Sequence, residues 1–280
     1  MITMTEKTVD PYFEKILAKV HKERNLDFSQ YREKLLMRRI MVRLRAIKET
    51  TFEKYFTYLT AHPSEMDQLV DVLTINVTEF FRDPDVFDVI ETRLIPELFE
   101  RKRALDSRVV RIWSCGCSSG QEAYSILMLI AEYLGAQLPR YQLSIYGTDI
   151  DTQSLARAKE GIYEASGFKN LAPRKRALLA KYFYDMGHDR YWIREEWPKY
   201  ITFQYHDMIA EPVLRHMDMI LCRNVMIYFD RPLQDQVIQR FWTSLQSEGF
   251  LVLGKVEGIL GWGSDHFTEY DRKARIYIKK

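Results

Sequence analysis

The 280-residue chain lacks several features that mark secreted, membrane-spanning or highly charged proteins. Its three cysteines, Cys115, Cys117 and Cys222, form no even disulfide framework, and no basic segment followed by an apolar one opens the chain. No run reaches the ~18 to 20 consecutive apolar residues that span a bilayer. Lysine and arginine number 41 against 39 acidic residues, so no overall field attracts nucleic acid. We therefore expect a reduced, cytoplasmic protein that does not insert into a membrane.

Patterns typical of metal sites are also missing. The Cys115-Gly116-Cys117 pair has only the distant Cys222 to add and no nearby pair of histidines, which falls short of four zinc ligands. The six histidines form no His-Glu-x-x-His pair. We expect no metal.

Residues 1–73 are predicted to form an all-helical domain. Apolar residues recur at helical spacing, as in the second helix, where Leu36, Ile40, Leu44 and Ile47 share one face. The same helix is rich in basic residues: Arg32, Lys34, Arg38, Arg39, Arg43, Arg45 and Lys48. Such charge is typical of a solvated helix face, and a surface for an acidic partner is the alternative.

Residues 109–280 are predicted to form an α/β domain. Short β-branched runs alternate with helical stretches, at 109–113, 143–146, 200–203, 219–221, 250–253 and 275–278. This alternation predicts a Rossmann-like domain with a mostly parallel sheet covered on both faces. Two aromatic segments around the turn 185–189 predict a small antiparallel β-subdomain, inserted as a hairpin at about 180–200. Residues 74–108 are predicted to be a helical linker.

Three segments, 109–121, 143–151 and 217–229, each end an apolar run with small and polar residues. The carboxyl ends of strands in an open parallel sheet share a crevice, so these segments are expected to converge on one ligand. In the first segment, Gly116 and Gly120 allow the backbone to approach that ligand closely. Their spacing differs from the Gly-x-Gly-x-x-Gly pattern that accommodates a pyrophosphate, which favours a cofactor without phosphate.

An acid, Asp149, stands at the tip of the second segment. It is well placed to accept both hydroxyls of a ribose, and S-adenosylmethionine presents a ribose without phosphate. Capping of the helix that begins near Ser154 is an alternative role for Asp149. An ordinary loop is likewise the alternative interpretation of the small-residue turn at Gly116.

Three blocks complete the pattern: Asn76-Val77-Thr78-Glu79-Phe80-Phe81-Arg82, Thr148-Asp149-Ile150-Asp151, and Cys222-Arg223-Asn224-Val225-Met226-Ile227-Tyr228-Phe229. With them the chain resembles, over nearly its whole length, the CheR family of chemotaxis receptor methyltransferases. The resemblance implies a protein-glutamate O-methyltransferase with S-adenosylmethionine as cofactor and S-adenosylhomocysteine as product. It also implies that residues 1–73 dock the receptor, that 74–108 contribute to the cofactor pocket, and that 109–280 form the methyltransferase domain.

The resemblance further implies a set of cofactor-binding residues. Glu122 matches an acid near the methionyl end, and Asp207 with Met208 matches the adenine position, where the family usually has asparagine and leucine. The whole implied set is Asn76, Thr78, Arg82, Gly116, Glu122, Asp149, Asp207, Met208, Arg223 and Asn224. The sequence departs from the family at 121–124, where a double acid and proline are usual, and at 254–257, where glycine-histidine-serine-glutamate is usual.

Arg82 and Tyr228 are the predicted catalytic residues. A guanidinium and a phenol can together hold a glutamate side chain in line with the methyl group. No base is needed, because a glutamate with a pKa of about 4.3 is already ionised at neutral pH. The alternatives are that Tyr228 is a core residue and that Arg82 pairs with Asp83 or Asp85.

The resemblance implies the cytoplasmic helical bundle of methyl-accepting chemotaxis receptors as partner, a monomeric enzyme, and recruitment to receptor arrays at the membrane. The predicted receptor-binding residues are Arg32, Lys34, Arg38, Arg39, Arg43 and Arg45. In the family the hairpin can also grip a tether at the receptor C-terminus. The brief turn 185–189 favours docking that needs no tether.

Two other functions remain open from the sequence. The first is methylation of nucleic acid, with the basic helix on phosphates, although the chain lacks an Asn/Asp-Pro-Pro-Tyr motif for base flipping. The second is a receptor adaptor that binds S-adenosylmethionine as a sensor and does not consume it.

Overall fold

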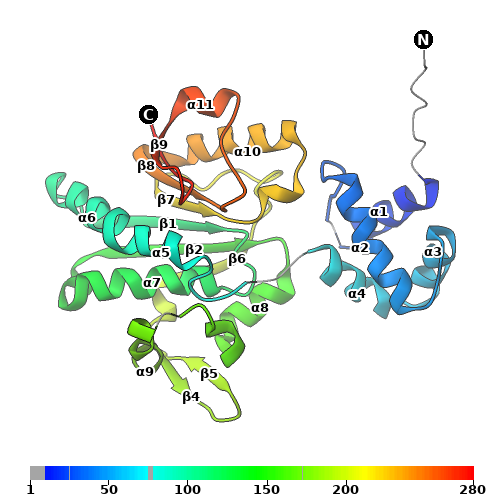
Figure 1. Ribbon diagram of the computed structural model, residues 1–280, viewed down its shortest axis with the longest axis horizontal. Helices are drawn as coiled ribbons and strands as arrows, with labels where there is room; N and C mark the ends of the chain where they lie inside the picture. The colour runs from blue at the N-terminus through cyan, green and yellow to red at the C-terminus, as the bar shows by residue number, and fades with distance from the viewer. Residues whose placement is uncertain (1–9, 25, 75–77, 172) are drawn as a thin grey trace. The chain divides into compact units, whose positions relative to one another are not determined.

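The computed structural model describes residues 10–24, 26–74, 78–171 and 173–280. The chain forms two compact units. The helical unit comprises Met1–Ile75 together with the short segment Tyr228–Asp230, and the α/β unit comprises Asn76–Ile227 and Arg231–Lys280. Figure 1 labels most of the helices and strands.

The helical unit contains α1 (Pro11–Arg24), α2 (Glu33–Ala46), α3 (Phe52–Ala61) and α4 (Ser64–Leu73). Helix α1 packs on α3, and α2 packs on α4. The predicted apolar face of α2 is buried at Leu36, Ile40 and Leu44, which recur every four residues and therefore lie on one side of the helix.

One buried carboxylate links three of these helices. Glu65 on α4 accepts hydrogen bonds from Nε and Nη2 of Arg43 on α2, each at 2.8 Å, and from the hydroxyl of Tyr55 on α3 at 2.9 Å. The glutamate is 6% exposed. Because a buried charge is stable only when it is paired and hydrogen-bonded, Arg43 has a structural role in this unit.

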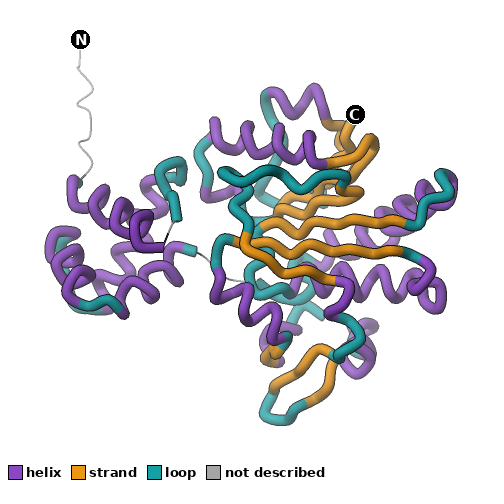
Figure 2. Tube along the Cα trace, turned by 180° about the vertical axis from the view of Figure 1, so that it is seen from behind, coloured by secondary structure: helices purple, strands orange, loops and turns teal. Residues whose placement is uncertain are grey.

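The large sheet of the α/β unit has, within the described residues, seven strands in the order β6-β2-β1-β7-β8-β10-β9. Strands β6, β2, β1, β7 and β8 are parallel, and β10 runs antiparallel to β8 and β9. Figure 2 shows the strands side by side. Their bounds are β1 (Val109–Cys115), β2 (Gln142–Asp149), β6 (Ile201–Tyr205), β7 (Met217–Cys222), β8 (Leu245–Leu253), β9 (Phe267–Asp271) and β10 (Ile276–Lys279).

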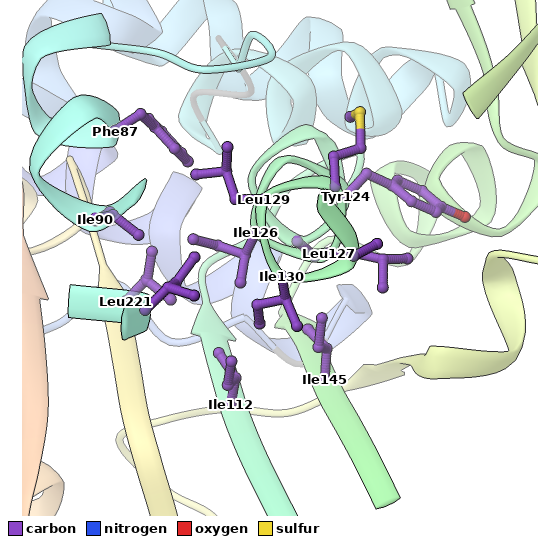
Figure 3. Packing of buried hydrophobic residues seen from close by; sticks show 14 of the residues in the cluster. Phe87, Ile90, Ile112, Tyr124, Ile126, Leu127, Leu129, Ile130, Ile145 and Leu221 are labelled. Carbon is purple, nitrogen blue, oxygen red and sulfur yellow. The ribbon is translucent and has the colours of Figure 1, made fainter. Parts of the chain in front are cut away.

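Helices cover both faces of this sheet. Consecutive residues of a strand point to opposite faces, and Ile112 and Trp113 of β1 are both fully buried. Ile112 packs with Ile126 and Ile130 in the cluster of Figure 3. Trp113 lies edge-on to Phe241, with ring centroids 5.6 Å apart. The helix carrying Ile126 therefore covers one face, and the helix carrying Phe241 covers the other.

Helices both precede and follow the first strand of the α/β unit along the chain. Before β1 come α5 (Pro84–Val89), the π-helical turn η1 (Ile90–Leu94) and α6 (Ile95–Ala104). After it come α7 (Gln121–Leu134), α8 (Thr152–Glu160), α9 (Ala177–Tyr182), α10 (Arg231–Ser244) and α11 (Trp262–His266).

A second, smaller sheet consists of β3 (Ile162–Glu164), β4 (Phe183–Asp185) and β5 (Arg190–Ile193) in the antiparallel order β3-β5-β4. The predicted hairpin is β4 and β5, and β3 adds a strand that the sequence did not reveal. Aromatic packing joins the small sheet to the rest of the unit: Phe80 lies edge-on to Phe183 of β4, with ring centroids 5.4 Å apart. The predicted fold class is confirmed.

No helix in the described parts of the chain combines the length and apolar character needed to cross a bilayer.

Candidate active site

The loop after β1 is fixed against the end of β2. The backbone N–H groups of Gly116 and Cys117 both donate to the carbonyl oxygen of Thr148, at 2.8 and 3.0 Å. Gly116 has a φ of +73°, and a Cβ there would lie 2.5 Å from Cγ2 of Val225. Only glycine fits this position, and the loops after β1, β2 and β7 meet there as the sequence predicted.

Asp149 closes the same loop from the tip of β2. Its Oδ2 accepts from the N–H of Ser118 at 2.8 Å, and its Oδ1 accepts from the N–H of Asp151 at 2.9 Å. Burial raises the pKa of this carboxyl group above its ordinary value. Helix α8 is capped by Asp151, which accepts from the N–H groups of Gln153 and Ser154. The capping role considered for Asp149 therefore belongs to its neighbour.

Arg223, directly after β7, contacts two other predicted site residues, Arg82 and Glu122, and also Asp83. Its Nη2 donates to the carbonyl oxygen of Arg82 at 2.8 Å and to Oδ2 of Asp83 at 2.7 Å, and its Nη1 lies 3.3 Å from Oε2 of Glu122. The other Glu122 oxygen accepts from the hydroxyl of Ser114 at 2.8 Å. The Arg223 side chain is 2% exposed, so these charges interact in a poorly solvated place. The structure thus brings Arg82, Glu122 and Arg223 into one network.

The segment before α5 is held in an unusual backbone conformation. Phe81 and Asp83, on either side of Arg82, have φ angles of +53° and +58°. The N–H of Phe81 donates to the hydroxyl of Ser125 on α7 at 3.0 Å, and both Phe81 and Ser125 are buried. The shape of this segment is therefore set by the α/β unit. Of the acids considered as Arg82 partners, Asp83 pairs with Arg223, and Asp85 pairs with Lys255 at 2.6 Å.

The remaining predicted cofactor residues lie at the ends of other strands. After β6, Asp207 Oδ1 accepts from the N–H groups of Ile209 and Ala210, so this carboxylate shapes its own turn. Met208 Sδ lies 3.6 Å from Cys115 Sγ at the tip of β1. Thr78 is half-buried. Asn76 lies outside the described residues.

Asn224 adopts a left-handed conformation, with a φ of +60°. Its N–H donates to Oε2 of Glu257 at 3.0 Å. Two buried side-chain atoms of this loop, Asn224 Oδ1 and Arg223 Nε, have no hydrogen-bond partner among the residues that the structure describes. Buried polar atoms normally have a partner, so this acceptor and this donor are available to hydrogen-bond a bound ligand or water.

Tyr228 belongs to the helical unit. Its carbonyl oxygen accepts from the N–H of Arg32 at 2.9 Å, and the carbonyl oxygen of Phe229 accepts from Nε of Arg32 at 2.9 Å. Tyr228 is half-buried, whereas Phe229 is 1% exposed and packs edge-on against Tyr31 at 5.0 Å. Phe229 is therefore the core residue of this segment.

The basic residues of α2 differ in exposure. Arg32, Lys34, Arg38 and Arg45 are exposed, and Arg39 and Arg43 are half-buried. In the described ranges, no group of three or more histidine, cysteine or acidic residues is arranged to hold a metal ion.

Both parts of the chain match known family models. Residues 11–74 match the CheR methyltransferase all-alpha domain, and residues 76–275 match the CheR methyltransferase SAM binding domain. The chain belongs to the CheR family. A chemotaxis protein methyltransferase of Listeria innocua is 33% identical over 249 residues, which are 89% of each chain. One of Escherichia coli is 31% identical over 284 residues, covering 98% of this chain and 91% of that relative.

The chain is accordingly an S-adenosylmethionine-dependent methyltransferase of the chemotaxis type, as the sequence predicted. The polar atoms of the site fit this cofactor. Its methionyl end carries an ammonium group, which can donate to Asn224 Oδ1, and a carboxylate, which can accept from Arg223 Nε. The carboxylates of Glu122 and Asp149 add acceptors for the ammonium and for the ribose hydroxyls.

Two residues that shape the site were missed by the sequence analysis. Thr148 supplies the carbonyl oxygen that holds the glycine loop, and its hydroxyl accepts from Nε1 of Trp113 at 2.8 Å. Its place in the Thr148–Asp151 block was a usable signal. Glu257 appeared in the sequence analysis only as part of the unusual segment 254–257. Its structural role was missed because its partners are backbone groups, which no sequence pattern identifies.

Proposed function

We propose that this CheR-family enzyme transfers the methyl group of S-adenosylmethionine to glutamate side chains on the cytoplasmic helices of methyl-accepting chemotaxis receptors. The products are glutamate γ-methyl esters and S-adenosylhomocysteine. The observation that carries the proposal is the Arg223 network, which holds the Arg82 segment beside Glu122 in the SAM-binding domain. The relatives of Listeria innocua and Escherichia coli are chemotaxis protein methyltransferases, which supports a chemotaxis receptor as the substrate.

The proposed chemistry needs alignment more than proton transfer. S-adenosylmethionine supplies an electrophilic methyl group on a cationic sulfur. The Arg82 guanidinium orients the acceptor carboxylate, and the Tyr228 hydroxyl donates a hydrogen bond to it. Both reacting charges diminish toward the transition state, so a site that excludes water favours the reaction. Asp149 is assigned to the ribose, and Arg223 with Asn224 to the methionyl end.

The proposed docking surface is the exposed face of α2. Lys34, Arg38, Met41 and Arg45 are exposed at spacings of three and four residues, which place them along one side of the helix. Arg32 and Arg43 lie at its margin, since they bind the Phe229 carbonyl and Glu65. A basic face with an exposed methionine suits an acidic receptor helix. We propose that the enzyme works as a cytoplasmic monomer recruited to receptor arrays.

The decisive experiment uses S-adenosylmethionine labelled in its methyl group and membranes that contain chemoreceptors. Label on the receptor that is released by mild base is the expected result, because carboxylate methyl esters are base-labile. Receptors whose acceptor glutamates are replaced by glutamine should take up no label before deamidation. The variants R82A and Y228F should lower the rate at saturating cofactor while S-adenosylhomocysteine still binds.

Other outcomes would overturn the proposal. Cofactor binding without turnover in the presence of receptor would indicate the adaptor function. Label on RNA or DNA, with affinity that falls steeply as salt rises, would indicate a nucleic-acid methyltransferase.

A further inference from the structure

The loops that follow β7 and β8 are joined by one buried side chain, Glu257. The two strands are neighbours, and their last paired residues are Cys222 and Leu253. Glu257 Oε2 accepts from the N–H of Gly254 at 2.6 Å and from the N–H of Asn224 at 3.0 Å. Its Oε1 accepts from the N–H of Ile227 at 3.2 Å. One carboxylate therefore ties three backbone amides from two loops.

The Glu257 carboxylate is buried and is surrounded by backbone N–H donors. The residue is 6% exposed, and the donors to its carboxylate are backbone N–H groups of Gly254, Asn224 and Ile227. Burial raises the pKa of this carboxyl group, while the amide hydrogen bonds oppose that rise. Without the carboxylate, these buried N–H groups would lose their acceptor, which is costly inside a protein. Glu257 therefore determines the shape of both loops.

The backbone leaves little freedom at this junction. A Cβ at Gly254 would lie 2.6 Å from Glu257 Oε2 and 2.7 Å from the nitrogen of Asn224. Asn224 itself is in the left-handed region, which asparagine adopts more readily than most residues with a side chain but which still needs support from its neighbours to be the single conformation. Its N–H bond to Glu257 is such a restraint.

We propose that Glu257 is a positioning residue for S-adenosylmethionine, acting through the backbone of Asn224 and Ile227. The inference rests on the proposed assignment of Asn224 to the cofactor. Glu257 holds Asn224 in the conformation that directs its carboxamide, with the buried acceptor Oδ1, toward the methionyl end. It also fixes Ile227, the residue before the predicted catalytic Tyr228.

The test compares E257A and E257Q with wild type. We expect E257A to raise the Kd for S-adenosylhomocysteine and the KM for S-adenosylmethionine by about tenfold, because misplacement of a binding group by ~1 Å can change a rate or affinity by up to ~100-fold. E257Q keeps an acceptor oxygen for Gly254 and Asn224 but turns an N–H group toward Ile227. It should therefore bind S-adenosylhomocysteine with an affinity between those of E257A and wild type.

The matched control is D218N. Asp218 is also a buried carboxylate of this sheet, but it lies at the opposite end of β7, where it pairs with Lys102 at 2.7 Å and accepts from the N–H of Arg111 at 2.9 Å. Its loss should lower the thermal unfolding temperature and leave the Kd for S-adenosylhomocysteine unchanged. Equal effects of D218N and E257A on that Kd would show that Glu257 acts through global stability alone, and the inference would be wrong.

Two further variants keep the result unambiguous. G254A places a methyl group between Glu257 and Asn224 and should weaken S-adenosylhomocysteine binding even if E257A does not fold. N224A tests the underlying assignment separately. If N224A binds S-adenosylhomocysteine as wild type does, the assignment of Asn224 fails; if only N224A is impaired and both E257A and G254A bind normally, the role of Glu257 fails.

Discussion

Among single residues, Arg223 connects the most groups of the candidate site. Its guanidinium binds the carboxylates of Asp83 and Glu122 and the carbonyl oxygen of Arg82 in different directions, which requires a planar group with several fixed N–H donors. A lysine ammonium at this position would carry the same charge but could not reach all three acceptors. The network therefore depends on the geometry of arginine and not only on its charge.

We predict that R223K lowers kcat/KM for S-adenosylmethionine by at least about tenfold, which equals ~1.4 kcal/mol of transition-state stabilisation. The Arg82 segment would lose its anchor while Glu122 kept a nearby cation. Initial rates with receptor membranes measure the effect. R93K is the control, because Arg93 forms a partly exposed pair with Asp271 at 2.8 Å in the same unit. An R223K enzyme as active as R93K would contradict a geometric role for Arg223.

The sequence identified which strand ends meet, because the topology of a parallel sheet brings the carboxyl ends of its strands together. The roles of the individual residues in cofactor binding stay predictions. The sequence suggested Asp149 as a possible helix cap, but the cap is Asp151, which lies three residues before Ser154, whereas Asp149 lies five residues before it. Side-chain direction decides this, and it depends on the loop at Ser118, more than 30 positions earlier in the chain. The role of Glu257 could not be predicted either, because it also depends on side-chain direction and on contacts with residues about 30 positions away.

At the scale of elements, α2 has a buried apolar face and an exposed basic face, for which we propose receptor docking. Leu36, Ile40 and Leu44 bury one side, and Lys34, Arg38 and Arg45 are exposed elsewhere on the helix. Exposed charges steer association and contribute little to folding, so their replacement should affect receptor recognition without unfolding the unit.

We predict that R38E and R45E each raise the KM for the receptor by about two- to fivefold, matching the ~0.5 to 1 kcal/mol of an exposed ion pair. The kcat at saturating receptor and the Kd for S-adenosylhomocysteine should not change. The effect should shrink at high salt, where charges are screened. K22E reverses an exposed charge on α1 instead and should behave as wild type. A similar KM for R38E, R45E and K22E would exclude α2 as the docking surface.

Sequence periodicity located the buried strands and the edge strand β6, but it missed the edge strand β9. Strands β1, β2 and β7 are buried runs, and the predicted segments lie inside them. Strand β9 was missed because it pairs only with β10 at the sheet edge, and Thr268 and Glu269 are exposed there. Edge strands need fewer apolar residues, so their pattern is weak. Strand β3 was also missed, because three residues are too few to show an alternating pattern.

For the whole molecule, the sequence predicts divisions after residues 73 and 108, and the two compact units of the structure are each discontinuous along the chain. Tyr228–Asp230 groups with the helical unit, where Phe229 packs against Tyr31 and Arg32 binds the Phe229 carbonyl. Such an association joins residues about 200 positions apart and leaves no local pattern, which is why periodicity could not foresee it.

The small sheet is the part of the molecule that could hold a receptor tail, and its edges are short. Strand addition needs an extended free edge, and the outer strands of the small sheet, β3 and β4, have only three residues each. The turn after β4 closes on itself, since Asp185 Oδ1 accepts from the N–H of Gly187 at 2.8 Å and the N–H of Arg190 donates to the Gly187 carbonyl. Little backbone is left to hold a peptide.

We therefore predict that removing the C-terminal tail of a receptor changes its methylation rate by less than about twofold, or ~0.4 kcal/mol. Y184S, which alters the exposed side chain of β4, should also leave the rate unchanged, whereas R38E should slow methylation of full-length and truncated receptors equally. Rates at receptor concentrations below the KM are the measurement, because recruitment by a tail acts through effective concentration. A loss of tenfold or more on truncation would show that the small sheet captures the tail, and α2 would then supply orientation after capture instead of the main attachment.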